Sequence, residues 1–238
     1  MKKKCFIITF HAEQDLVLRS VQEINKKLNP NYICCVHSHN KTTPILEQII
    51  QLSDSYLKLS NLGKQYPKHE LHAQCICRNY SIGFSNVYKN VPEIEYIVAL
   101  TGDTLVTNAM NFEHRYQEMK RNKTVARVAT SGIVNFLSAN SDPAKGKQIF
   151  YTQSTNRTNF FPQLFIVDGE FAQKTKVFSN IEVTNKFTSE ECLGSELLKH
   201  IDKNNYSKYV AKLNTHTSRP YGYADGVKYH ARTGGPGG

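Results

Sequence analysis

Residues 78–108 read RNYSIGFSNVYKNVPEIEYIVALTGDTLVTN, and they predict a helix, a stop and a buried strand in close succession. Apolar residues recur at near-helical spacing up to Val91, and Pro92 ends the helix because proline cannot continue the hydrogen-bond ladder. The run EYIVAL is short, apolar and rich in β-forming residues, which is typical of a central strand covered on both faces. A carboxylate just past such a strand lies where open α/β sheets bind their ligands. Asp103 is therefore the first candidate for a functional residue.

Strands and helices alternate around this stretch. KCFIITF and YICCVHSH are predicted strands, and LVLRSVQEINKKL between them carries a helical apolar stripe. The order predicts one α/β domain with a mixed, mostly parallel sheet flanked by helices. In the second half we expect a helix over 111–122, a strand before a turn at Asp168-Gly169, and a helix starting at Thr188 or Ser189.

The net positive charge of the chain favours acidic partners but does not identify one. The chain has 238 residues, a formal net charge of +10 and a pI of about 9.2, so nucleic acid, anionic membranes and phosphorylated small molecules are all plausible partners. No segment approaches the roughly 20 apolar residues that cross a bilayer, and the opening apolar run is too short for a signal peptide. We expect a cytosolic protein, peripheral at most to a membrane. The six cysteines lack zinc-site spacing and are expected to be reduced and buried.

Four segments together resemble the GT-A fold of nucleotide-sugar-dependent glycosyltransferases, family 2 in particular. They are IITFHAEQD, RNYSIGFSNVYKN, YIVALTGDTLV and FTSEECLGSEL. In that family the first segment holds the nucleotide base and the second approaches the diphosphate. The third corresponds to the Asp-x-Asp strand that binds a divalent metal, and the fourth to the helix start that supplies a catalytic base.

The resemblance implies a set of site residues and ligands. The implied nucleotide-binding residues are Thr9, Phe10, His11, Ser38, His39, Arg78 and Gly102. The implied catalytic base is Glu191 or Glu190. The implied metal ligands are Asp103 and the tail histidines His216 and His230, holding Mn²⁺ or Mg²⁺. The expected reaction is hexosyl or pentosyl transfer from a UDP- or GDP-sugar to a glycan or other hydroxyl acceptor, with inversion favoured.

Each role meets a physical need, and each residue also has a simpler interpretation. A diphosphate leaving group needs its charge neutralised, which a cation held by Asp103 provides; Thr101 stands where the family has its first acid, so the metal needs a further ligand. Asp103 is otherwise a turn residue, Glu190 and Glu191 are otherwise an ordinary capping box, and the histidines otherwise belong to an inert chain end. Asp168 is a second candidate base, near the acceptor side.

The predicted organisation is one domain over residues 1–213 with a Gly/Tyr/His-rich tail over 214–238. Residues 1–108 would form the nucleotide-binding half and 109–213 the acceptor half, while the tail is either loosely ordered or folded over the site. Two other functions stay open. A sugar-phosphate nucleotidyltransferase usually has a Gly-rich loop after the first strand, which is missing here. An RNA-binding module fits the charge, but the basic residues are not clustered and no nucleic-acid motif occurs, so no specific nucleic-acid partner is expected.

Overall fold

The computed structural model places the α/β part of the chain and several shorter pieces after it. It describes residues 1–11, 14–38, 42–59, 68–102, 104–128, 164–182, 189–201, 210–212, 215–218, 221–224 and 227–230. For 68–74, 189–191 and the pieces from 210 onward, the description covers the backbone. Across all these ranges, none of the helices is both long and apolar enough to cross a membrane.

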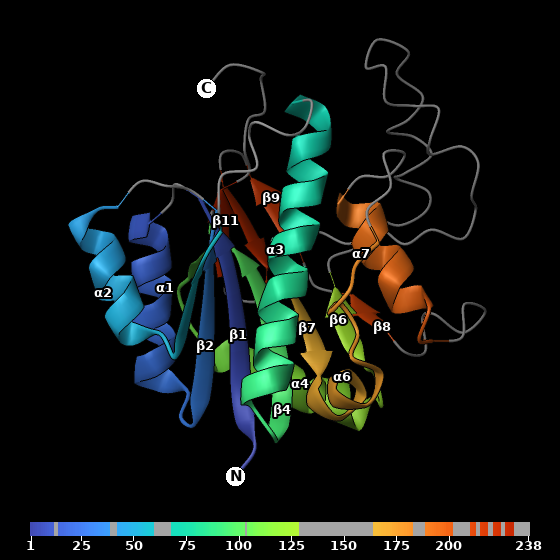
Figure 1. Ribbon diagram of the computed structural model, residues 1–238. Helices are drawn as coiled ribbons and strands as arrows, with labels where there is room; N and C mark the ends of the chain where they lie inside the picture. Colours follow the sequence, from blue (N-terminus) through green and yellow to red (C-terminus); the bar gives the residue numbers. More distant parts are fainter. Residues whose placement is uncertain are drawn as a thin grey trace.

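A seven-stranded sheet in the order β3-β2-β1-β4-β7-β6-β8 forms the centre of the fold (Figure 1). All of its strands run in one direction except β7, which is antiparallel to both of its neighbours. The strands are β1 (Lys3–Phe10), β2 (Asn31–His37), β3 (Ser55–Lys58), β4 (Ile94–Thr101), β6 (Ala126–Val128), β7 (Leu164–Asp168) and β8 (Val210–Lys212). The predicted mixed, mostly parallel α/β sheet is confirmed.

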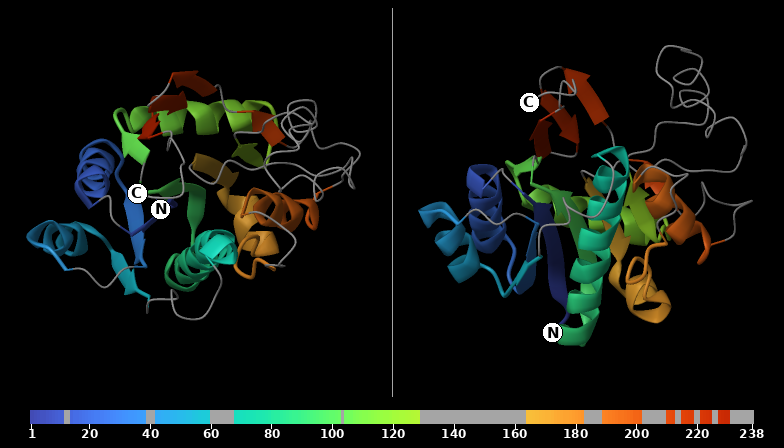
Figure 2. Two further views of the ribbon diagram at one scale, coloured as in Figure 1. Left: turned by 90° about the horizontal axis from the view of Figure 1, so that it is seen from above. Right: turned by 45° about the horizontal axis from the view of Figure 1, so that its top comes forward.

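Helices cover both faces of this sheet, as Figure 2 shows from above. One face carries α3 (Lys68–Asn90), α6 (Gly169–Thr175) and α7 (Ser189–Leu198). The other carries α1 (Gln14–Lys27), α2 (Pro44–Leu52) and α4 (Met110–Arg121). Alternate residues of β1 feed the two cores: Cys5 and Ile7 face α3, while Phe6 and Ile8 face α1. The central strands are therefore buried on both sides, as their apolar runs predict.

Two local predictions from the sequence are wrong. The helix expected to start near Arg78 begins at Lys68. Asp168-Gly169 is not a turn but the start of α6, because the Asp168 side chain accepts a hydrogen bond from the Phe171 N–H (2.8 Å) and caps the helix. An Asp-Gly pair fits a turn and an N-cap equally well, and the tertiary structure decides between them.

A second, smaller sheet lies above the carboxyl ends of the central strands (Figure 1). It has the order β5-β11-β10-β9, and all of its described pairs are antiparallel. Its strands are β5 (Thr104–Val106), β9 (Thr215–Ser218), β10 (Tyr221–Ala224) and β11 (Val227–His230). The three tail strands thus attach to the short strand that follows β4.

The cysteines are free, and all but the half-buried Cys75 are buried. Burial raises the pKa of the Cys34 and Cys35 thiols to about 12. Both thiols therefore stay protonated at neutral pH and act as small core residues.

Gly83 lets α3 approach the sheet closely, which leads to a first prediction. A Cβ at this position would lie 2.4 Å from Ile7 Cγ2 and 3.5 Å from Val36 Cγ2. We expect Gly83→Ala to destabilise the protein by about 1 kcal/mol in urea unfolding, because overpacking costs about 1–3 kcal/mol and the better helix propensity of alanine returns about 1 kcal/mol. Ile7→Leu removes the methyl group in the way, so the double variant should lose less than the sum of the two single losses. Simple additivity would contradict this packing.

Candidate active site

The carboxyl ends of β1, β2 and β4 are tied into one edge by hydrogen bonds. The Gly102 N–H donates to the Thr9 carbonyl oxygen (2.7 Å), and the Ser38 N–H donates to the Phe10 carbonyl oxygen (3.0 Å). The Ser38 hydroxyl also donates to the Phe10 carbonyl oxygen (3.4 Å). Four of the residues predicted to bind the nucleotide therefore lie together at the edge where parallel sheets bind ligands.

His11 follows β1 directly and is exposed, and a buried histidine holds its backbone. The Nε2 of His37 lies 3.3 Å from the His11 carbonyl oxygen, and the His37 side chain is fully buried. The sequence analysis did not single out His37. Its position two residues after the buried Cys35, on the same face of β2, could have indicated that it is buried. His39, also predicted to bind the nucleotide, lies outside the described residues.

Asp103 lies outside the described residues too, but its neighbours on both sides are firmly held. Gly102 is bonded to β1 as above, and Thr101 Oγ1 lies 3.4 Å from Thr104 Oγ1. The Ser20 hydroxyl of α1 donates to the Thr104 carbonyl oxygen (3.3 Å) and accepts from the Val106 N–H (3.0 Å). The chain therefore enters and leaves position 103 through fixed points on β1 and α1.

The tail strand β11 lies against this same point. Tyr229 pairs with Thr104, and Val227 pairs with Val106. His230 follows Tyr229 in β11, and Asp103 precedes Thr104. The backbone of His230 is therefore adjacent to the Tyr229–Thr104 pair. His216 lies on β9 and is paired with Tyr223 of β10. The register thus brings His230 toward the end of β4 and leaves His216 two strands away.

Arg78 lies on the N-terminal half of α3, between the buried residues Cys77 and Asn79. Gly83 contacts Ile7 in the middle of β1, and Arg78 lies more than one helical turn closer to the carboxyl edge. Its side chain is exposed, while that of the next residue, Asn79, is buried. Burial raises the pKa of Cys75, and the Arg78 guanidinium opposes that rise. Arg78 is thus an exposed cation on the half of α3 that is nearer the carboxyl edge.

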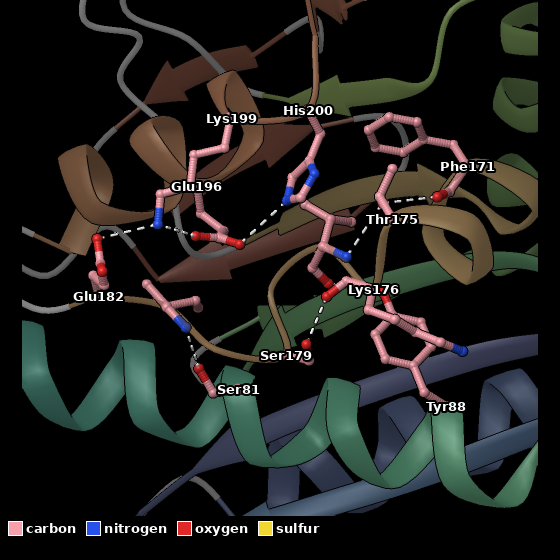
Figure 3. A network of polar contacts seen from close by, with 12 residues as sticks. Ser81, Tyr88, Phe171, Thr175, Lys176, Ser179, Glu182, Glu196, Lys199 and His200 are labelled. Carbon is pink, nitrogen blue, oxygen red and sulfur yellow. Dashed lines mark hydrogen bonds and ion pairs between the residues drawn. The ribbon is translucent and has the colours of Figure 1, made fainter.

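Glu190 and Glu191 lie in the first turn of α7. The segment before α7 climbs along α3: Tyr88 donates to the Val177 carbonyl oxygen (2.8 Å), and further along the Ile181 N–H donates to Ser81 Oγ (3.1 Å). Figure 3 shows α7 lying above α3, with His200 toward the Tyr88 end. The first turn of α7 therefore points toward the N-terminal half of α3, which bears Arg78.

A polar network fixes the far end of α7 (Figure 3). The Glu196 carboxylate is nearly buried and lies 3.0 Å from Lys199 Nζ and 3.4 Å from His200 Nε2. Lys199 also reaches Glu182 at 3.2 Å, and its hydrogen bond to Glu196 is the main cause of its raised pKa. A buried carboxylate requires such partners, so the helix that carries Glu190 and Glu191 is anchored at its opposite end.

Asp168 is not near this edge, so its prediction as a second candidate base is wrong. It ends β7, and because β7 is antiparallel to β4, it pairs with Tyr96 near the start of that strand. Its carboxylate caps α6 and accepts from the Tyr116 hydroxyl (3.2 Å). Asp168 is therefore a structural residue at the opposite edge of the sheet.

The metal site is not assembled within the described part of the chain. No group of three or more His, Cys, Asp or Glu side chains there is placed to hold a metal ion. This search does not reach the predicted ligands, because Asp103 lies outside the described residues and the backbone alone is described at His216 and His230. The register of β11 is the observation that bears on them.

Comparison with known proteins finds similar structures, but no matching family model or curated sequence. No family model matches the chain, and no curated protein matches it significantly. Staphylococcus aureus TarS superposes with a TM-score of 0.51 at 12% identity, over 90% of this chain and 35% of TarS. The mannosyltransferase PcManGT from Pyrobaculum calidifontis, in complex with GDP-Man and Mn²⁺, gives 0.48 at 10% identity over 88% and 54%. The mannosyltransferase Ktr4p from Saccharomyces cerevisiae gives 0.46 at 15% identity over 93% and 72%.

These matches define a fold rather than a family. The chain spans 35% of TarS and 54% of PcManGT, so much of each of those proteins has no counterpart here. The mixed α/β fold is similar to that of glycosyltransferase structures. What the protein does is a separate question, which depends on its own residues.

Proposed function

We propose that the protein transfers a sugar from a nucleoside-diphosphate donor to an acceptor hydroxyl, with the help of a divalent metal. The observation that carries this proposal is the edge itself. Thr9, Phe10, Ser38 and Gly102 meet there, and both neighbours of Asp103 are held in place. Arg78 is exposed on the half of α3 that is nearer this edge. This arrangement supports a site in which a nucleotide, its diphosphate and a carboxylate for the metal would meet.

The metal ligands that we propose are Asp103 and His230. The β5–β11 register supports His230, because its neighbour Tyr229 pairs with Thr104. His216 lies two strands further away, roughly 10 Å across the smaller sheet at about 4.8 Å per strand. A carboxylate and an imidazole together suit Mn²⁺ better than Mg²⁺. When bound, the metal would neutralise charge on the departing diphosphate.

The other roles that we propose use the remaining residues implied by the resemblance. Arg78 would bind the phosphate oxygens through charge-assisted hydrogen bonds, and the turn at His11 with Ser38 and His39 would receive the base and ribose. Glu191, or Glu190 beside it, would accept the proton of the acceptor hydroxyl. Residues 1–108 would then bind the donor and 109–213 the acceptor, with the tail 214–238 completing the site.

The test is a thermal-shift panel of GDP-, UDP-, CMP- and dTDP-sugars with and without Mn²⁺. GDP-mannose is a suitable first probe, since PcManGT was solved with it. A ligand that binds only the folded state raises Tm as its concentration exceeds Kd, so one nucleotide class should stabilise the protein more strongly with Mn²⁺. If no nucleotide shifts Tm, the proposal is refuted. If the protein instead releases pyrophosphate from a nucleoside triphosphate and a sugar phosphate, nucleotidyl transfer would replace glycosyl transfer as its function.

Variants of the proposed ligands sharpen this test. We expect Asp103→Ala to abolish the Mn²⁺-dependent part of the Tm shift. We expect His230→Ala to raise the Mn²⁺ concentration needed for that shift about 10-fold or more. His216→Ala is the matched control, because it removes a tail histidine that the register keeps away from β4. Retention of the full Mn²⁺ effect in Asp103→Ala would remove Asp103 from the metal site, and equal losses in the two histidine variants would contradict the choice of His230.

A further inference from the structure

His37 is a buried imidazole at the end of β2 to which the proposed reaction gives no role. Its side chain has no exposed surface, and its ring stacks on the Phe10 ring with centroids 4.6 Å apart and planes 13° from parallel. Burying a polar ring costs free energy unless its nitrogens are hydrogen-bonded. The contacts of these two nitrogens therefore show what the residue does.

Both ring nitrogens lie within reach of partners on neighbouring elements. Nδ1 is 2.8 Å from the Tyr56 hydroxyl of β3, and Nε2 is 3.3 Å from the His11 carbonyl oxygen. A carbonyl oxygen can only accept, which assigns the proton of the neutral ring to Nε2 and makes Nδ1 the acceptor of the Tyr56 hydroxyl proton. The imidazole thus connects the end of β1 to β3 through β2.

The backbone of His37 reinforces the same connection. In the sheet, His37 pairs with Phe10 of β1 on one side and with Lys58 of β3 on the other. The Leu59 N–H donates to the His37 carbonyl oxygen (2.8 Å). His11 is the point at which the chain leaves β1 on its way to α1. An aliphatic side chain could fill the same volume, but it could not hold the His11 carbonyl.

We propose that His37 is a positioning residue that fixes the backbone of His11, at the end of β1, so that this part of the edge can receive the donor nucleotide. The identity of the ligand rests on the function proposed above, whereas the hold on the His11 carbonyl rests on the contacts of the His37 ring. His37 acts through His11 and Phe10 and does not itself touch the nucleotide. Loss of its hydrogen bond should therefore weaken donor binding without slowing turnover once the donor is bound.

Four variants separate this role from ordinary core packing. His37→Phe keeps an aromatic ring for stacking and removes both polar contacts. His37→Gln retains an N–H donor for the His11 carbonyl, and Tyr56→Phe removes only the hydroxyl. Val91→Ala is the control, because it creates a cavity in the opposite core near the far end of α3, away from this edge.

The first measurement is hydrogen–deuterium exchange of the free protein. His37→Phe should speed exchange about 10-fold in the segment around His11 and at the Ser38 amide, because a lost buried hydrogen bond corresponds to roughly that factor. Tyr56→Phe should have a smaller effect in the same segment, and Val91→Ala none there. Unchanged exchange around His11 in both His37→Phe and Tyr56→Phe overturns the proposal.

The second measurement is the affinity for GDP and UDP by calorimetry, with KM and kcat for the donor. We expect His37→Phe to weaken affinity and raise KM about 10-fold with kcat unchanged, and His37→Gln to recover most of the loss. Faster exchange with unchanged nucleotide affinity overturns the proposal. If the wild-type protein binds no nucleotide but exchange around His11 still responds to His37→Phe, the proposed function fails while the hold of His37 on the His11 backbone stands.

Discussion

Gly169→Ala is expected to leave the protein severely destabilised. A Cβ at Gly169 would lie 2.2 Å from the Ile94 carbonyl oxygen and 2.6 Å from the Glu95 carbonyl oxygen. Both atoms are backbone of β4, the central strand, so no side chain can rotate away to make room. Overpacking typically costs 1–3 kcal/mol where side chains yield, and we expect about 3 kcal/mol or more here.

The surroundings of Gly169 prevent α6 from moving away. Asp168 caps the helix through the Phe171 N–H, and Gln173 donates to the Pro92 carbonyl oxygen just before β4. Any retreat of α6 would break the Gln173–Pro92 hydrogen bond and open a gap beside Ala172, which is fully buried. A loss of about 3 kcal/mol is a large part of the roughly 5–15 kcal/mol that holds a domain folded.

The measurement is urea unfolding of Gly169→Ala beside Gly83→Ala. Both variants add one methyl group to a glycine at a helix–sheet contact, but at Gly83 the added methyl meets a side chain and at Gly169 it meets backbone. Gly169→Ala should show the much lower midpoint, or fail to accumulate as soluble protein. Similar midpoints for the two variants would contradict the close contact of Gly169 with the β4 backbone.

The first half of the fold could be predicted because its information is local. The apolar runs of β1, β2 and β4 and the stripe of α1 indicate their structures within a few residues, and alternation then implies parallel pairing. The same local reasoning places Phe10, Ser38 and Gly102 at one edge. Such inferences need only strand ends and the rule that parallel strands finish at the same side.

The rest of the structure depends on contacts between residues distant in sequence. Tyr229 pairs with Thr104 across more than a hundred residues, and nothing in the tail marks β11 as its partner. The direction of β7 is equally invisible in the sequence, and the placement of Asp168 on the acceptor side failed for that reason. His37 was passed over because a polar residue at a strand end is usually exposed, whereas here β3 and Phe10 enclose it.

Glu191→Gln is the catalytic variant with the largest expected effect. If Glu191 accepts the acceptor proton, the amide cannot replace it, and kcat should fall about 10²- to 10⁴-fold. Gln keeps the size of Glu, so donor affinity in the thermal-shift panel should stay unchanged. The first turn of α7 is a suitable place for this base, because the helix dipole favours an ionised carboxylate there and the Glu196–Lys199 pair holds the helix at its other end.

Glu190→Gln is the matched control, since it neutralises a carboxylate in the same turn one residue away. Adjacent helical residues diverge by about 100° (3.6 residues per turn), so both cannot serve the same acceptor oxygen equally well. A large fall in kcat for Glu190→Gln alone would transfer the role to Glu190. Full activity in both variants would remove the base from α7 and, with it, the reason to expect inversion.

The anomeric configuration of the product, read by NMR before mutarotation, tests the expectation of inversion independently. Inversion requires a single displacement with a base on the acceptor side. A product with retained configuration would rule out this single displacement.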